Sequence, residues 1–228
     1  MLSWFKKLFA SKPSARPEGP RLSATWLRGA DSPFGMDVLD CREACGSTRS
    51  ASSDQEVAVG FLALRSSDGR QHRGRLPEGA WSAVCDLSFP YHGERRDGTV
   101  FGADEMEDKW DIHLYGDRLY FSRSWTGVLV YVAAAAFDPN SVRLTTIWVA
   151  GGLDRDATYH VAVVDYLVKS HLFRMRAPHP FPRDLRNDPG MLALFSFSQY
   201  GRRAAYGSYG DTTRIRIPEP TGSSPGEA

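Results

Sequence analysis

Residues 109–150 read KWDIHLYGDRLYFSRSWTGVLVYVAAAAFDPNSVRLTTIWVA, and this stretch decides the fold. Apolar and polar side chains alternate at its start, which is typical of a half-buried strand. Gly116-Asp117 then provides a two-residue hairpin turn, because glycine tolerates a positive φ. The whole pattern predicts an antiparallel meander of about four strands. The expected strands are residues 109–115, 118–122, 128–137 and 142–150.

The segments around the meander supply the rest of the expected fold. Asp156 is a predicted N-cap for a helix over residues 157–173, whose apolar side chains share one face. Strands are expected at residues 36–39, 80–87 and 212–217, and either a helix or a strand at residues 55–65 and 191–200. Together these elements predict a single-domain α+β fold in which an antiparallel β-meander packs against one long helix.

The composition is that of an ordinary globular protein. The chain has 228 residues, of which 42% are apolar and 24% are charged, and its net charge is +1. These values exclude a disordered, collagenous or coiled-coil protein. No apolar run reaches the ~20 residues that a membrane-spanning helix needs, which excludes an integral membrane protein. The near-zero charge argues against a dedicated nucleic-acid-binding protein, so no nucleic-acid partner is expected.

Charge is unevenly distributed along the chain. Residues 1–21 hold five basic residues and one acidic residue, a balance of +4, which leaves 23 basic and 26 acidic residues, a balance of −3, for the remainder. Residues 1–10, MLSWFKKLFA, combine an apolar face with two lysines. They are expected to make a weak contact with an anionic membrane surface or a partner groove, unless they pack on their own domain or are disordered.

The predicted division of the chain follows from these composition changes. A basic amphipathic arm and linker occupy residues 1–21, an α+β domain occupies residues 22–217, and a disordered tail occupies residues 218–228. The linker is rich in proline and serine, and the tail is rich in glycine, serine and proline.

Cysteine use predicts a cytoplasmic protein, peripheral to the membrane if the arm binds there. Cys41, Cys45 and Cys85 are too few and odd in number for a secreted disulfide framework. Cys41 and Cys45 lack CxxC spacing, and the six histidines show no HxH or HxxxH spacing. Reduced, buried thiols are therefore expected, with no metal and no other cofactor.

An acidic cluster surrounds the start of the meander. Glu107 and Asp108 precede Trp110, and Asp111 follows it. The hairpin brings Arg123 back toward this position, so an Asp111–Arg123 ion pair across the ladder is expected. The alternative is a pair of carboxylates that performs acid–base or metal chemistry.

Two further segments hold candidate residues. Ser124 lacks the GxSxG context of a nucleophile and is expected to be a turn serine, while Trp125 is expected to fix that turn by packing its indole. Residues 200–211 interleave tyrosine, arginine and glycine, which favours either anion binding or an exposed loop whose arginines pair with acidic residues. His171, at the predicted helix end, is expected to be a cation on the helix dipole. The candidate binding residues are Glu107, Asp108, Trp110, Asp111, Arg123, Trp125, Tyr200, Arg202 and Arg203.

Five motifs stand in a fixed order along the chain. They are FGMDVLDCR (34–42), EMEDKWD (105–111), LYFSRSWTG (119–127), VDYLVKSH (164–171) and ALFSFSQYGRRAAYG (193–207). From residue 26 to residue 217 the chain resembles a family of uncharacterised bacterial proteins in which these motifs recur. The resemblance implies a bacterial, cytoplasmic protein and brings no known activity to this sequence.

Two functions are compatible with these observations. The first is a binding protein with a protein partner, of the immunity or partner-neutralising kind, which fits the many aromatic side chains, the acidic body and the missing catalytic motif. The second is an enzyme that acts on a phosphate-bearing small molecule through acidic and arginine side chains. An enzyme should gather these side chains in one deep pocket, whereas a flat surface favours the interaction protein.

Overall fold

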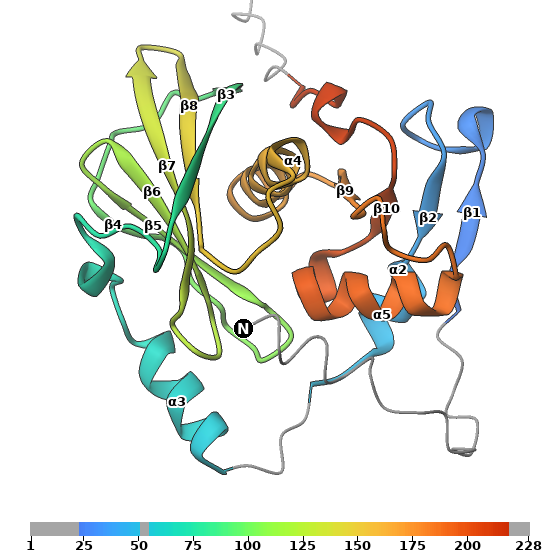
Figure 1. Cartoon of the computed structure of the whole chain (residues 1–228), viewed down its shortest axis with the longest axis horizontal. Helices are drawn as coiled ribbons and strands as arrows, with labels where there is room; N and C mark the ends of the chain where they lie inside the picture. Colours follow the sequence, from blue (N-terminus) through green and yellow to red (C-terminus); the bar gives the residue numbers. More distant parts are fainter. Residues whose placement is uncertain (1–22, 51–54, 219–228) are drawn as a thin grey trace, which may run out of the picture.

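A computed structural model describes residues 23–50 and 55–218 of the chain (Figure 1). These residues form an α+β fold with two sheets and four α-helices. The larger sheet is antiparallel and has six strands in the order β3-β8-β7-β6-β5-β4, and the smaller sheet has the order β1-β2-β10-β9. The expected arm at residues 1–21 and nearly all of the expected tail lie outside the described residues.

The expected meander corresponds to β5 to β8 of the larger sheet, within one residue at each end. Its bounds are β3 (Trp81–Pro90), β4 (Gly98–Phe101), β5 (Trp110–Tyr115), β6 (Arg118–Arg123), β7 (Leu129–Asp138) and β8 (Ser141–Val149). Gly116 has a φ of 60° in the β5–β6 turn, as the hairpin requires. At the opposite edge β3 pairs with β8, and their register shifts between Val84 and Leu87.

The smaller sheet joins segments that are far apart in sequence. Its strands are β1 (Thr25–Leu27), β2 (Val38–Asp40), β9 (Pro178–Pro180) and β10 (Tyr206–Ser208). β10 pairs antiparallel with β2 and parallel with β9. The segment at residues 201–211, one of whose expected forms is an exposed loop, therefore contains a buried strand.

The helices lie between and beside the two sheets. They are α2 (Arg42–Ser47), α3 (Gln55–Arg65), α4 (Ala157–Leu167) and α5 (Pro189–Tyr200). Figure 1 shows α4 between the sheets, where it contacts β3 on one side and β9 on the other. The Asp156 carboxylate accepts a hydrogen bond from the Tyr159 amide at 3.1 Å, which confirms the predicted N-cap of α4. Among the described residues, no helix is long and apolar enough to cross a membrane.

Two expectations about regular structure are wrong. The expected single long helix is one of four, and it leaves α geometry at Leu167 for a π-helical turn over Val168–Leu172. The expected strand at residues 212–217 begins as a 3₁₀ turn over Thr212–Arg214, because the Asp211 carboxylate accepts from the Thr213 amide and caps that turn.

One face of the larger sheet packs into the hydrophobic core. Ile112, Phe121 and Ile147 point to this inner face and are fully buried. The same core contains Val164 of α4 and Leu39 of β2, so it joins both sheets through the helix between them. The opposite, outer face is covered near β5 and β6 by residues 66–79 and is left partly exposed near β7, β8 and β3.

Candidate functional site

Most of the predicted site residues meet where residues 105–110 contact the end of α5. The Asp108 carboxylate, which is 1% exposed, accepts from Arg202 Nε at 3.1 Å and from Arg202 Nη2 at 3.0 Å. Arg203 Nε lies 3.6 Å from the same carboxylate. Arg202 Nη1 also donates to Glu105 at 2.7 Å. We call Glu105, Asp108, Arg202 and Arg203 the clasp.

A close backbone contact fixes the clasp. Gly201 follows α5 with a φ of 72°, and a Cβ at this position would lie 1.8 Å from the Glu107 carbonyl oxygen. Only glycine therefore fits here, because the backbone has a positive φ and because a Cβ would overlap the carbonyl oxygen. The Arg202 amide donates to the same carbonyl at 3.2 Å, which ties the backbone of the acidic segment to the turn after α5.

Arg123 does not pair with Asp111, so that prediction is wrong. The register places Asp111 opposite Ser122, with its side chain on the outer face, where it accepts from the Ala103 amide at 2.8 Å. Arg123 lies opposite Trp110 and points to the other face. It donates to the last carbonyls of α5, at Ser198 (3.0 Å) and Gln199 (2.9 Å).

Burial has opposite effects on these two groups. It raises the pKa of Asp111 to about 6 and lowers the pKa of Arg123 to about 10. The Trp110 indole lies 4.8 Å from the Arg123 guanidinium and donates to the Gln199 carbonyl at 2.8 Å. Arg123 and Trp110 thus act together as a cap on the C-terminus of α5.

Lys109 is a residue of this region that the sequence-based prediction missed. Its ammonium group donates to the Met106 carbonyl at 2.7 Å and to the Ser50 hydroxyl at 2.6 Å, and it lies 4.5 Å from the Trp125 ring. Burial, with a smaller contribution from Arg123, lowers the pKa of Lys109 to about 8. Glu107 accepts from the Ser50 amide at 2.9 Å.

The remaining predicted residues also have structural partners. Trp125 donates its indole N–H to the Met106 carbonyl at 2.8 Å, and Ser124 donates to the Asp108 carbonyl at 2.7 Å. The Tyr200 ring is fully buried, and its hydroxyl donates to the Pro180 carbonyl at 3.4 Å. His171 is buried and its pKa is lowered to about 3 by that burial, so the expected cation at the helix end is wrong.

These contacts define what the region can do chemically. Both arginines of the clasp are paired with acids, and Arg123 is used on backbone carbonyls. No group of three or more metal-binding side chains exists among residues 23–50 and 55–218. The cluster therefore fastens the acidic segment to α5 and leaves no carboxylate–guanidinium pair open to a phosphate.

A buried thiol cluster lies beside Ser196 in the C-terminal half of α5, and its contact with His179 was not predicted. Cys41 and Cys45 are free and buried, as expected, and the Cys41 thiol lies 3.6 Å from the Ser196 hydroxyl. The Cys45 thiol and His179 lower the pKa of Cys41 to about 5. Cys41 and His179 both have no exposed surface, so this cluster offers no access to a substrate.

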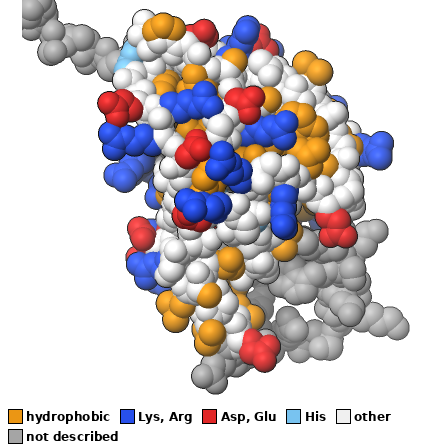
Figure 2. All heavy atoms as spheres, turned by 90° about the vertical axis from the view of Figure 1, so that its left-hand side faces the viewer, with side chains coloured by type: hydrophobic (Ala, Val, Ile, Leu, Met, Phe, Trp, Pro, Cys, Tyr) orange, Lys and Arg blue, Asp and Glu red, His pale blue; other side chains and the backbone are white. Residues whose placement is uncertain are grey.

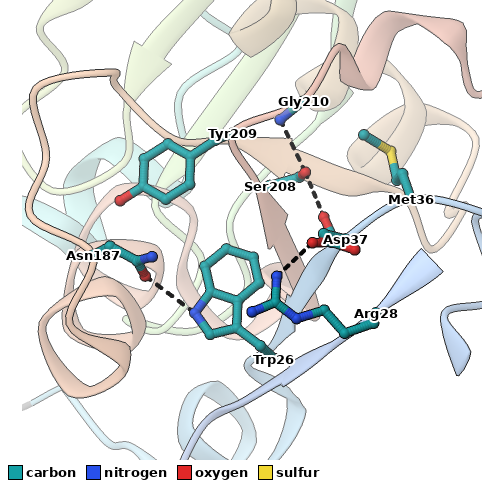
Figure 3. A pocket seen from close by; sticks show the side chains of 8 residues that line it. All are labelled: Trp26, Arg28, Met36, Asp37, Asn187, Ser208, Tyr209 and Gly210. Carbon is teal, nitrogen blue, oxygen red and sulfur yellow. Dashed lines mark hydrogen bonds and ion pairs between the residues drawn. The ribbon is translucent and has the colours of Figure 1, made fainter.

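A pocket of about 240 Å³ opens beside the smaller sheet (Figure 3). Its wall contains the stacked rings of Trp26 and Tyr209, whose centroids are 6.1 Å apart. The Trp26 indole donates to Asn187 at 3.1 Å, and Arg28 forms an ion pair with Asp37 at 2.5 Å. The polar side chains of this pocket are thus paired with one another. Its walls come from segments that are distant in sequence, so no sequence pattern indicated the pocket.

The outer face of the larger sheet carries a different kind of surface. Arg118, Ala134, Thr146 and Val84 lie in one row across β6, β7, β8 and β3, and Val84 is 87% exposed. Trp148 is partly exposed in the next row. Figure 2 shows this side of the molecule, where basic and acidic side chains both lie around hydrophobic ones.

We call Val84, Ala134, Trp148, Arg118 and Arg143 the outer patch. Arg143 belongs to the same face because it lies opposite Ala136, two residues after Ala134. None of these residues was predicted as part of a site. Exposed aromatic side chains were expected in general from the sequence, but Trp148 was not singled out.

Comparisons with known proteins identified no relative of this chain. No protein-family model, curated protein or solved structure matches the chain. The resemblance to a bacterial family therefore depends on the five sequence motifs alone.

Proposed function

We propose that this protein is a binding protein that holds a protein partner on the surface of its larger sheet. The observation that carries the proposal is the outer patch, in which Val84 is exposed and Trp148 is partly exposed beside arginines on the open part of a sheet. Sheets of this kind bury one face in the core and present the other, and exposed apolar surface rimmed by polar residues is typical of protein interaction sites.

The contacts of the clasp support an interaction protein over an enzyme. A phosphate-binding site needs guanidinium groups that are free to form paired hydrogen bonds with phosphate oxygens. Arg202 is already bidentate with Asp108, and Arg123 donates to two carbonyls. An enzyme that used these arginines to bind a phosphate-bearing small molecule would have to break their present contacts first. The enzyme is therefore the less supported alternative.

Affinity purification from the native host tests the proposal. The full-length chain, tagged at its C-terminus and cross-linked in the cell, should retain one protein in a defined ratio through size-exclusion chromatography. If that protein is toxic when produced alone and harmless when produced with the chain, the partner-neutralising form of the proposal is supported. A chain that elutes alone and forms no cross-link to another protein under any growth condition contradicts the proposal.

Titration with inorganic phosphate and a panel of nucleotides tests the alternative. A binding protein should show no shift of its thermal unfolding midpoint with any of them. A shift that disappears in Arg202→Gln, with unchanged folding by circular dichroism, would favour the enzyme.

A further inference from the structure

We infer that the outer patch is a docking site for an acidic protein surface with an apolar centre. This inference rests on the proposed function and specifies the partner of the same surface. It depends on two properties of the patch, its exposed apolar centre and its arginines without acidic partners, and on a comparison of the charges of the other possible occupants.

The apolar centre comes from neighbouring strands. Val84 of β3 lies opposite Thr146 of β8, and Ser82 of β3 lies opposite Trp148. Trp148 rests on Val132 beneath it, but none of the described segments that cover Tyr115 and Tyr120 extends over Val84. The Trp148 indole N–H has no hydrogen-bond partner among the described residues, so a donor is available at the middle of the patch.

The arginines of the patch have no acidic partner among the described residues. Arg118 lies over the Trp148 ring at 5.1 Å, and Arg143 is exposed; neither forms an ion pair with a described carboxylate. Arg118 and Arg143 share this property with several other surface arginines, but of the described arginines they alone combine it with a position beside Val84 and Trp148 on the outer face.

The missing ion pairs matter because residues 22–228 carry 26 acidic and 23 basic residues, yet neither Arg118 nor Arg143 forms an ion pair with a carboxylate in the part of the chain that the structure describes. Asp86 and Asp117 are the nearest acids along the strands, and neither bonds to these arginines. The carboxylates that would complete the patch are therefore expected from a partner.

Charge decides against the other occupants. A second copy of the chain that docked through the same face would place its own Arg118 and Arg143 against these residues, and residues 1–21 carry +4, so both would be repelled. A nucleic acid would need free aromatic faces for its bases, whereas Arg118 already occupies one face of Trp148. An acidic and apolar polypeptide satisfies each group: aliphatic side chains on Val84, carboxylates on the arginines, and a carbonyl on the indole N–H.

Fluorescence anisotropy with two labelled peptides tests the inference on the full-length protein. One peptide contains six Glu and six Leu residues, and the other contains Lys in place of Glu. The Glu peptide should bind the wild type, and R118E/R143E should weaken its binding about tenfold or more, since two favourable charge contacts become repulsive. V84E, a change at a side chain that the fold does not need, should weaken it in the same direction.

R183E/R186E is the matched control, because it makes the same change of charge at two exposed residues of the segment before α5. Its affinity for the Glu peptide should equal that of the wild type within about twofold. The inference is overturned if the Glu peptide does not bind the wild type, if R118E/R143E and the control bind it equally, or if the Lys peptide binds as well. Binding of a labelled single-stranded DNA that R118E/R143E abolishes, without Glu-peptide binding, would also overturn it.

The native-host purification separates this inference from the proposed function. A partner that is lost by R118E/R143E, kept by R183E/R186E and cross-linked through an acidic segment supports both. A partner that stays bound to R118E/R143E leaves the proposed function standing and overturns the docking site. If no partner is retained by the wild type, the proposed function itself fails.

Discussion

Asp108 is the residue on which the clasp depends, because one buried carboxylate faces two arginines. Asp108→Asn keeps the size of the side chain and removes its charge. We expect it to lower the free energy of unfolding by about 3 kcal/mol, since Arg203 loses its acidic partner and Arg202 keeps only the exposed Glu105. Urea denaturation measures this loss.

Glu105→Gln is the control for Asp108, because Glu105 pairs with the same arginine while its side chain is 57% exposed. Solvent screens this outer pair, so the expected loss is below about 1 kcal/mol. Equal losses for the two variants would show that the burial of Asp108 contributes nothing to the clasp.

Gly201 allows a test of backbone contact. Gly201→Ala adds both an unfavourable backbone conformation and a clash with the Glu107 carbonyl, whereas Gly116→Ala adds only the conformation, as nothing lies within 4 Å of a Cβ at Gly116. We expect a loss of stability of about 1 kcal/mol for Gly116→Ala and about 3 kcal/mol or more for Gly201→Ala. Thermal unfolding of both variants decides this, and similar midpoints would contradict the contact.

Three of the four residues of the clasp could be predicted from the sequence, but the geometry of the region and the outer patch could not. The alternation of charge and aromatic side chains singled out Asp108, Arg202 and Arg203, which do meet. The partner of Arg123 depended on whether residue 110 or residue 111 stood opposite it, and a shift of one residue moves a side chain to the other face. Lys109 was missed because its burial requires Ser50 and Trp125, which come from separate segments.

A buried ion pair joins the last turn of α4 to the π-helical turn that follows it. Asp165 and Lys169 are both buried, and burial raises the pKa of Asp165 to about 6. Lys169→Met leaves the carboxylate alone in the core, so we expect a loss of about 3 kcal/mol. The double variant Asp165→Leu/Lys169→Met removes both charges and should recover most of that stability. Urea denaturation of the set measures it, and a double variant less stable than Lys169→Met would contradict this view.

The segment that covers part of the outer face encloses a histidine pair. His72 and His113 have ring centroids 6.0 Å apart, and burial, followed by the charge of His72, lowers the pKa of His113 to about 4. The unfolded chain protonates this histidine below pH 6.5 while the folded chain does not, so the free energy of unfolding falls as the pH decreases from 6.5 toward 4.

His113→Gln measures this contribution by difference. Between pH 7 and pH 5 the wild type should lose about 2 kcal/mol more than the variant, which corresponds to the 1.5 pH units below the unfolded pKa. The comparison cancels the opposite effect of Asp111 and Asp165, whose raised pKa values favour the folded state as the pH falls. Identical pH dependence in the two proteins would show that His113 is protonated equally in both states.

Elements made of local contacts could be predicted, and elements made of distant ones could not. β5 to β8 are consecutive hairpins with alternating side chains, so their pattern and turns appear together in one stretch. β9 and β10 have three residues each, and they exist because Tyr206 pairs with Pro178 and with Asp40. The segment at residues 191–200 is apolar enough for either a strand or a helix. It is a helix because Asp188 caps it and Pro189 begins its first turn.

At the scale of the whole molecule, residues 1–21 and the remaining chain carry opposite charge. We expect the full-length protein to sediment with phosphatidylglycerol vesicles, and K6E/K7E to lower its partition coefficient about thirtyfold or more, as each lysine near an anionic surface contributes about 1 kcal/mol. R183E/R186E is the control: it has the same net charge as K6E/K7E, because both replace two basic residues by Glu, but it leaves residues 1–21 unchanged. It should therefore bind the vesicles as the wild type does. Equal sedimentation of all three proteins would remove the membrane contact expected for residues 1–10.

Strand β3 closes the larger sheet with an edge that another chain cannot readily extend. The register shift after Val84 interrupts its hydrogen-bonding pattern, and Pro90 at its end has no amide hydrogen to offer. Strand-by-strand polymerisation, the usual hazard of an open sheet with apolar side chains nearby, is therefore blocked at this border. The exposed apolar side chain of Val84 therefore lies beside a sheet border that does not favour the addition of a further strand.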